Sequence, residues 1–225
     1  MCRKKAIMKK ISIYNNKGGV AKTTSVINIA YAMHKAGKKV LVVDCDTQEN
    51  CYSFFLTSRN TAKVLPTAYE NIEHTTWASY SELENEKLEN YDFILFDLPP
   101  AMSNEVKKII TQSDKVYVPT VLGEFEIAGL KRVTEEVGSK LGGIFVTMYQ
   151  KDNDKDINEQ FRSLLQDRLL QTTIPYSKTV RESQKKGLPI EEYFIERGVP
   201  RLFKNSWNIV NAYEALTKEI MGGEA

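Results

Sequence analysis

The sequence has few of the residues that build disulfide frameworks or metal clusters. Its three cysteines, Cys2, Cys45 and Cys51, are an odd number in 225 residues and stand in no spacing that is typical of metal ligands. It also lacks an apolar run long enough for a secretory signal or a membrane-spanning helix, since only a short apolar stretch follows the basic start MCRKKAIMKK. We therefore expect a protein of the reducing cytoplasm without a membrane anchor.

A large excess of one charge sign is absent as well. Lysine and arginine number 31 against 29 acidic residues, which gives a formal net charge of +2. Any affinity for nucleic acid must therefore come from a local patch. The length suffices for one large α/β domain and is too short for two comfortable ones. We expect a single domain over residues 1–225, with residues 1–9 as a flexible N-terminal end.

The stretch ISIYNNKGGVAKTT, residues 11–24, has the pattern of a strand, a glycine-containing loop and the start of a helix. The two glycines allow successive backbone N–H groups to converge on phosphate oxygens, and the helix start adds partial positive charge. Lys22 adds a full charge, and the Thr23 hydroxyl is placed to bind Mg²⁺. The alternative is a glycine-rich turn with its lysines in solvent. The pattern predicts a polyphosphate site made of Lys17, Gly18, Gly19, Val20, Ala21, Lys22, Thr23 and Thr24.

Two further apolar runs end in carboxylates. Residues 40–43 lead to Asp44 and Asp46, and residues 93–96 lead to Asp97. Ligands of open α/β sheets bind at the carboxyl edge of the strands, and an aspartate that ends an apolar strand can hold Mg²⁺ through a bound water. Strand alternation predicts that Asp44 and Asp46 point to the same side. The alternative for this pair is simple turn chemistry at the end of a strand.

These motifs together resemble the deviant Walker A ATPases of the ParA/MinD group. KGGVAKTT opens with a second lysine, Lys17, and has Asn16 and Ala21 where the ordinary phosphate loop has glycine. DCDTQEN, residues 44–50, is similar to the D-x-D-P-Q-x-N motif of the ParA family, with Thr47 in place of proline. DLPP, residues 97–100, resembles the D-x-P-P motif of that family. The resemblance covers nearly the whole chain from Lys10.

The resemblance implies an ATPase that is weak alone and stimulated by a partner, with ATP and Mg²⁺ as cofactors. By the same resemblance, Asp46 positions the attacking water, and Asp44 and Asp97 support the Mg²⁺ ion together with Thr23. Lys22 acts within its own subunit. Lys17 reaches across to the phosphates of the other subunit in an ATP-bound homodimer.

The fold expected from the pattern is α/β, with a mostly parallel sheet flanked by helices on both faces, as in phosphate-loop NTPases. Strands are expected at residues 40–43, 93–96, 115–120, 142–149 and 172–174. Helices are expected at residues 22–36, 104–112, 123–137, 159–170 and 205–221. Residues 151–158 are expected to be a polar loop, and residues 51–89 are less informative.

The C-terminal third extends the resemblance through IPYSKTVRESQKKGLPI, residues 174–190. Relatives bound to the nucleoid use basic residues of this region in both subunits, and the alternative is a merely solvated basic face. The last helix lacks the basic amphipathic tail of MinD-type membrane binders. We expect that no helix-turn-helix domain precedes the phosphate loop. The candidate DNA-binding residues are Lys178, Arg181, Lys185, Lys186, Arg201 and Lys204.

The function that the resemblance implies is DNA partitioning, of a plasmid or a chromosome. The ATP dimer would bind DNA non-specifically, and hydrolysis stimulated by a ParB-like centromere-binding protein would release it. We expect a cytoplasmic protein that joins the nucleoid when ATP is bound. Two alternatives stay open. One is a MinD-like or other regulatory ATPase of the same superfamily, and the other is a nucleotide-binding interaction module without hydrolysis.

Overall fold

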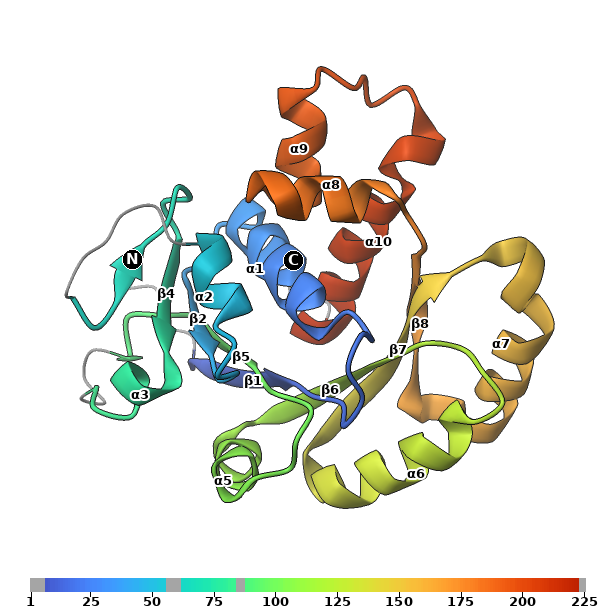
Figure 1. The fold of residues 1–225 in the computed structure, drawn as a ribbon, viewed down its shortest axis with the longest axis horizontal. Helices are drawn as coiled ribbons and strands as arrows, with labels where there is room; N and C mark the ends of the chain where they lie inside the picture. The colour runs from blue at the N-terminus through green and yellow to red at the C-terminus, as the bar shows by residue number, and fades with distance from the viewer. Residues whose placement is uncertain (1–6, 56–61, 84–87, 223–225) are drawn as a thin grey trace, which may run out of the picture.

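The strands of the computed structural model, which describes residues 7–55, 62–83 and 88–222, form one sheet (Figure 1). Its order is β3-β4-β2-β5-β1-β6-β7-β8. All neighbouring strands are parallel except β3 and β4, which are antiparallel. The strands are β1 (Lys9–Ile13), β2 (Val40–Asp44), β3 (Leu65–Pro66), β4 (Ile72–Thr76), β5 (Phe93–Asp97), β6 (Lys115–Thr120), β7 (Leu141–Tyr149) and β8 (Leu169–Pro175).

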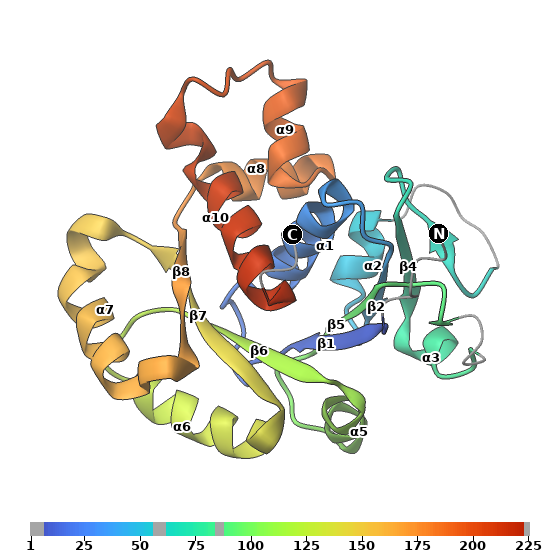
Figure 2. The ribbon, with the colours of Figure 1, turned by 180° about the vertical axis from the view of Figure 1, so that it is seen from behind.

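Helices cover both faces of the sheet. Helices α1, α9 and α10 pack on one face, and α5, α6 and α7 pack on the other (Figure 1). Seen from behind, α10 lies beside α1 (Figure 2). The helices are α1 (Lys22–Lys35), α2 (Asn50–Phe55), α3 (Trp77–Tyr80), α5 (Asn104–Gln112), α6 (Glu126–Val137), α7 (Lys151–Leu165), α8 (Thr179–Lys186), α9 (Ile190–Glu196) and α10 (Lys204–Met221).

Each central strand is buried on both sides, which explains its continuous apolar run. In β2, Val40 and Val42 join the core under α1, while Leu41 and Val43 join the core on the opposite face. Strand β5 alternates in the same way. A parallel sheet covered on both faces needs apolar residues at every position of such a strand. The predicted fold class is therefore confirmed, and the carboxyl ends of β1, β2 and β5 meet at one edge.

Several predicted elements are confirmed to within one or two residues, and one prediction is wrong. The expected loop at residues 151–158 is the first half of α7, which ends at Leu165, and β8 already begins at Leu169. Asp152 and Asp154 in the first turn complement the positive helix end, and Asp154 accepts the Gln150 N–H at 2.7 Å. The acidic run that suggested a loop thus stabilises a helix start.

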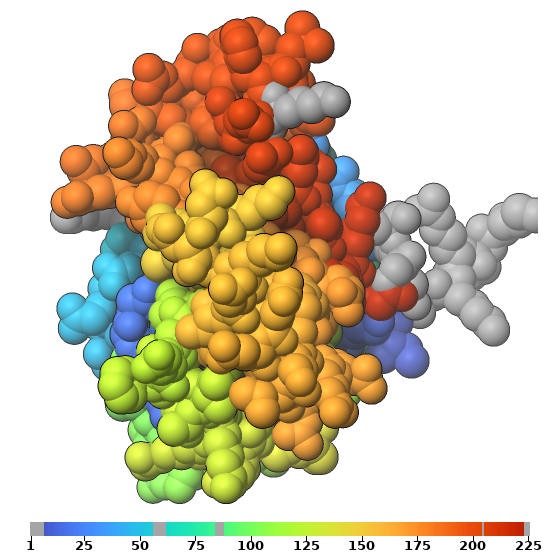
Figure 3. Space-filling view, turned by 90° about the vertical axis from the view of Figure 1, so that its right-hand side faces the viewer, coloured from blue at the N-terminus to red at the C-terminus, as the bar shows by residue number. Residues whose placement is uncertain are grey.

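Helices α8 and α9, which the sequence pattern did not indicate, belong to a lobe that projects beyond the sheet on the side of α1 (Figures 1 and 3). Several hydrogen bonds tie the lobe to α1, among them one from Gln184 and one to Asn28. Gln184 donates to the Thr24 hydroxyl at 2.8 Å, and the N–H of Ile190 donates to Asn28 at 3.0 Å. Among the helices in the described ranges, none is both long and apolar enough to cross a membrane.

His74 on β4 is a buried ionisable group without a polar partner among the described residues. Only 1% of its surface is exposed, and neither ring nitrogen has a hydrogen-bond partner. Its ring lies 4.8 Å from the ring of Tyr52, centroid to centroid, and 6.0 Å from that of Phe55. Burial lowers the pKa of His74 from 6.5 to about 4.

We expect this burial to make stability fall as the pH falls. Between pH 6.5 and pH 4 the unfolded chain binds a proton at His74 that the folded chain does not bind, so stability rises with pH in this window. The contribution lost by pH 4 is about 3 kcal/mol, because each pH unit between a pKa of 6.5 and one of about 4 contributes roughly 1.4 kcal/mol. In His74→Phe, the free energy of unfolding, measured with urea at several pH values across this window, should depend less steeply on pH. The control is His34→Gln, which changes the other histidine. If this variant, and not His74→Phe, reduces the pH dependence of the free energy of unfolding, His74 is not the group responsible.

Candidate functional site

The loop between β1 and α1, residues 14–21, is held in place by side chains from the neighbouring strands. Asn15 is buried, and its amide donates to the carbonyl of Pro119 at 2.7 Å while its oxygen accepts the Lys17 N–H at 2.9 Å. The Thr147 hydroxyl contacts the carbonyls of Val20 and Thr120 at 3.3 and 3.1 Å. The loop is thus fixed to the carboxyl ends of β6 and β7 before any ligand binds.

Two left-handed residues bend this loop into the start of α1. Gly19 has φ 76° and Ala21 has φ 63°, and the carbonyl of Ala21 accepts the first helical N–H, from Ser25, at 2.9 Å. The first turn of α1 contains no acidic residue, so its positive end is not neutralised locally. The Lys22 ammonium donates to the carbonyl of Lys17 at 2.8 Å and therefore lies across the loop. Free N–H groups and a lysine here form a cradle suited to phosphate.

Asp97 lies behind the cradle as a buried carboxylate without compensation of its own. It is 2% exposed, and neither carboxylate oxygen has a partner at hydrogen-bonding distance and angle. Burial raises the pKa of Asp97 to about 7, although the Thr23 hydroxyl and the Lys22 ammonium oppose that shift. Both oxygens are therefore available to a cation or to water that a cation orders.

Asp44 is in register with Asp97 on the neighbouring strand, but its oxygens are already engaged. One accepts the N–H of Asp46 at 3.0 Å, and the other accepts the N–H of Tyr52 at 2.8 Å. Asp44 thus braces the loop that follows β2. The strand ends at Asp44, so the alternation that was expected to extend to Asp46 stops there. Asp46 lies in the loop, half-buried, and accepts the Gln48 N–H at 3.1 Å.

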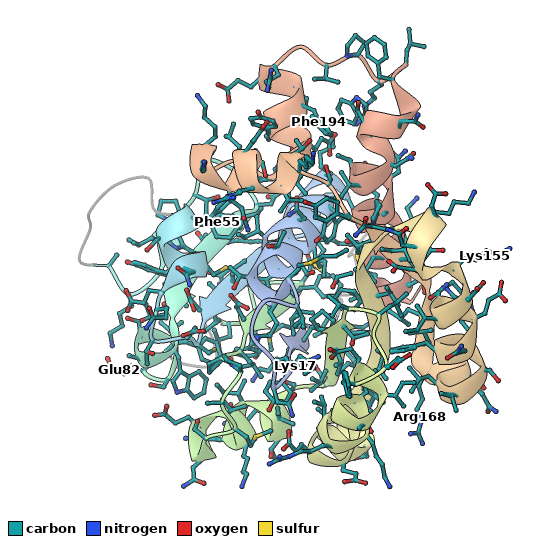
Figure 4. All side chains as sticks on the ribbon, turned by 45° about the vertical axis from the view of Figure 1, so that its right-hand side comes forward. Lys17, Phe55, Glu82, Lys155, Arg168 and Phe194 are labelled. Carbon is teal, nitrogen blue, oxygen red and sulfur yellow. The ribbon has the colours of Figure 1, made fainter. Side chains whose placement is uncertain are left out.

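Lys17 turns away from its own cradle toward α6. Its ammonium donates to Glu126 Oε1 at 2.7 Å, in the first turn of α6 (Figure 4). Lys17 and Lys22 therefore point in different directions from the same loop. Of the residues predicted for the site, those of the loop, Asp44, Asp46 and Asp97 are brought together at the carboxyl edge of the sheet.

A pocket of about 800 Å³ beside the loop was not predicted from the sequence. Loop residues Gly19 and Ala21 form one wall, and Met148, Pro175 and Tyr176 at the ends of β7 and β8 form another. Tyr176 is 52% exposed and Met148 is 39% exposed, so apolar surface is available at the pocket. Flat apolar surface beside a phosphate cradle suits an aromatic base. In the sequence, Tyr176 directly after β8 is the one signal that could have indicated this pocket.

The six basic residues predicted to bind DNA are not equivalent. Four of them, Lys178, Arg181, Lys185 and Lys186, are exposed at or on α8 and make no ion pair within the described residues, and the first three also line the pocket. Arg201 instead pairs with the buried carboxylate of Glu191 and lies 4.8 Å above the ring of Trp207. The side chain of Lys204 lies outside the described residues.

Comparison with known proteins agrees with this geometry. A family model described as the CobQ/CobB/MinD/ParA nucleotide binding domain matches residues 11–190. The chain is 28% identical to the chromosome-partitioning ATPase Soj of Treponema pallidum, over 95% of this chain and 97% of that protein. An ATP complex of a McdA variant from Cyanothece has a TM-score of 0.76 at 16% identity, over 98% of both chains. MinD of Pyrococcus horikoshii complexed with Mg-ADP has a TM-score of 0.72 at 20% identity, over 95% of this chain and 96% of that one.

The left-handed conformation of Ala21 predicts an effect on stability. A residue with a Cβ is strained there, whereas glycine is not, so Ala21→Gly should raise the free energy of unfolding by roughly 0.5 to 1 kcal/mol. The matched control is Ala215→Gly, since Ala215 is exposed inside α10 and glycine there should cost about 1 kcal/mol. Urea unfolding measures both. Equal losses in the two variants would contradict the strained conformation at Ala21.

Proposed function

Because the chain belongs to the CobQ/CobB/MinD/ParA nucleotide-binding family, we propose that it is a ParA-type partition ATPase of the cytoplasm. It binds ATP and Mg²⁺, closes as a homodimer and holds DNA non-specifically, on the nucleoid, until hydrolysis stimulated by a ParB-like centromere-binding protein reopens it. The observation that carries this proposal is the pair of lysines on one loop. Lys22 lies across the cradle and Lys17 points out of it.

The nucleotide is proposed to lie along the loop with its base in the neighbouring pocket. The N–H groups at the start of α1 face the β- and γ-phosphates, and Lys22 exchanges its contact with the carbonyl of Lys17 for a phosphate oxygen. That exchange is favourable because a charged acceptor replaces a neutral one. The base stacks against the exposed surface of Tyr176 and Met148.

The residues present fit a Mg²⁺ ion. Oxygen ligands are the ones that Mg²⁺ prefers, and it keeps several waters and phosphate oxygens in its shell, so few protein ligands are needed. The Thr23 hydroxyl would bind the ion directly, and the unpartnered carboxylate of Asp97 would hold its water. Asp44 supports the ion from behind by fixing the loop after β2. When bound, Mg²⁺ neutralises charge that develops on the phosphates.

Asp46 is proposed to orient the attacking water. It lies close enough to Lys22 and Asp97 to affect the pKa of both groups, and it is only half-buried, so water can reach it. The bonds that fix Asp46 come from the backbone: its own N–H to Asp44, and the Gln48 N–H to its carboxylate. One carboxylate oxygen of Asp46 stays available to the water.

The basic helix α8 is proposed as the DNA surface. Its exposed cations are unpaired in the described structure, and Gln184 joins the helix to the Thr24 hydroxyl, next to the proposed Mg²⁺ ligand. Dimerisation would present two such helices together, which raises affinity through avidity. Arg201 is not included in this surface because it forms an ion pair with Glu191.

We expect Asp46→Ala to abolish ATP hydrolysis while ATP binding persists. A residue that only orients water contributes to the transition state and not to the ground state, so kcat should fall at least about a hundredfold with little change in nucleotide affinity. Phosphate release and fluorescent-nucleotide binding measure the two effects. Glu49→Gln, an exposed charge of the same loop, serves as the control and should change neither. A parallel loss of nucleotide binding in Asp46→Ala would assign Asp46 to ligand binding.

We expect DNA binding with ATP to depend on Lys17. Roughly three phosphate contacts from each subunit give a log–log salt slope near −5 for the dimer and about half of that for the monomer. Lys17→Gln should therefore weaken DNA binding and flatten the slope, measured by fluorescence anisotropy across a salt series. Lys155→Gln removes the same charge from the exposed surface of α7 and should behave as wild type (Figure 4). Equal affinities and slopes for wild type and Lys17→Gln, with ATP turnover intact, would leave a regulatory ATPase of the same family.

A further inference from the structure

Lys17 is held by its own chain at three points. Its N–H donates to Asn15 at 2.9 Å, its carbonyl accepts the Lys22 ammonium at 2.8 Å, and its own ammonium donates to Glu126 at 2.7 Å. The first two contacts fix the backbone, so they do not restrict where the side chain points. The contact with Glu126 is the one that decides the direction of the ammonium.

The first turn of α6 is shaped to receive this lysine. Glu126 lies in that turn, where the positive helix end stabilises a carboxylate, and its side chain is only 15% exposed. One turn further, Gly129 lies beside the lysine stem, since a Cβ there would be in ordinary van der Waals contact with Lys17 Cε, at 3.9 Å. The side chain of Lys17 is 42% exposed, so it is held at the surface and not buried.

We propose that Glu126 is a latch that retains Lys17 within its own subunit and sets the threshold for ATP-dependent closure of the dimer. The inference rests on the proposed function, because it requires Lys17 to act on the nucleotide of the other subunit. The ammonium lies against α6 of its own subunit, so to reach phosphates across an interface it must leave its position beside Glu126. Closure must therefore break the Lys17–Glu126 pair in both subunits, and the latch favours the open monomer.

The strength of the latch follows from its exposure. Half-exposed ion pairs shift an equilibrium by about two- to fivefold. A dimer breaks two pairs, so the factor is squared, and removing the latch should tighten the dimer by about 4- to 25-fold.

Glu124 provides the matched control for Glu126. It lies two residues earlier, just before α6 begins, and it carries the same charge. It is exposed and makes no ion pair within the described residues. Glu124→Gln therefore removes the same charge from the same surface without touching Lys17.

The first test needs no nucleotide and no dimer. Lys17 of the full chain is labelled with a limiting amount of an amine-acetylating reagent, and its modification is measured by mass spectrometry. An ammonium paired with a carboxylate reacts slowly, so Glu126→Gln should raise the modification rate of Lys17 severalfold, while Glu124→Gln should not. An unchanged rate in Glu126→Gln overturns the latch, whatever the function of the protein.

The second test measures the dimer dissociation constant by sedimentation with a non-hydrolysable ATP analogue. Glu126→Gln should tighten the dimer by about tenfold, Glu124→Gln should leave it unchanged, and Glu126→Asp should keep most of the wild-type behaviour. A weaker dimer in Glu126→Gln overturns the latch and makes Glu126 an interface group. If the wild type stays monomeric with the ATP analogue while Glu126→Gln still raises the acetylation rate of Lys17, the proposed dimer switch is contradicted but the pairing of Lys17 with Glu126 is supported.

Discussion

The buried carboxylate of Asp97 is the constraint on which the rest of the site depends. A carboxylate at this depth is costly unless charge or hydrogen bonds compensate it, and here its oxygens have neither in full. The nearby compensation is Lys22, which burial in turn drives toward its neutral form. The charged form of each group is therefore stabilised by the other, and a further charged ligand would stabilise the charged forms of both. A polyphosphate with its metal ion supplies both missing charges at once.

The scaffold keeps this costly arrangement in place by tying the loop to several elements. Asn15 joins it to β6, Thr147 joins it to β7, and Gln184 joins the first turn of α1 to α8. These contacts come from residues more than a hundred positions away in the sequence. A loop held from three sides has little freedom to lose when a ligand binds, which lowers the entropic cost of binding.

The sequence predicted the parts of the structure that local rules determine. Residues 104–112 form a helix as expected, because Ser103 caps it by accepting the Val106 N–H, and the apolar runs that end in Asp44 and Asp97 are central strands. The first half of α7, residues 151–158, was expected to be a loop because its acidic start is equally typical of a loop. The pocket and the pairing of Lys17 with Glu126 could not be predicted, since both join segments that meet only in the folded chain.

The distribution of positive charge in a nearly neutral chain fits the two anionic ligands of the proposed function. Both ammonium groups of the loop already have protein partners: Lys22 donates to a carbonyl, and Lys17 donates to a carboxylate. Each must therefore exchange its partner before it can bind phosphate. The cations of α8 have no such partners within the described structure and can meet a phosphate backbone directly. An exchange that starts from a neutral carbonyl costs less than one that starts from a carboxylate. In the proposed function, Lys22 would therefore respond first to a nucleotide within its own subunit, and Lys17 would follow only when a second charged ligand competes with Glu126.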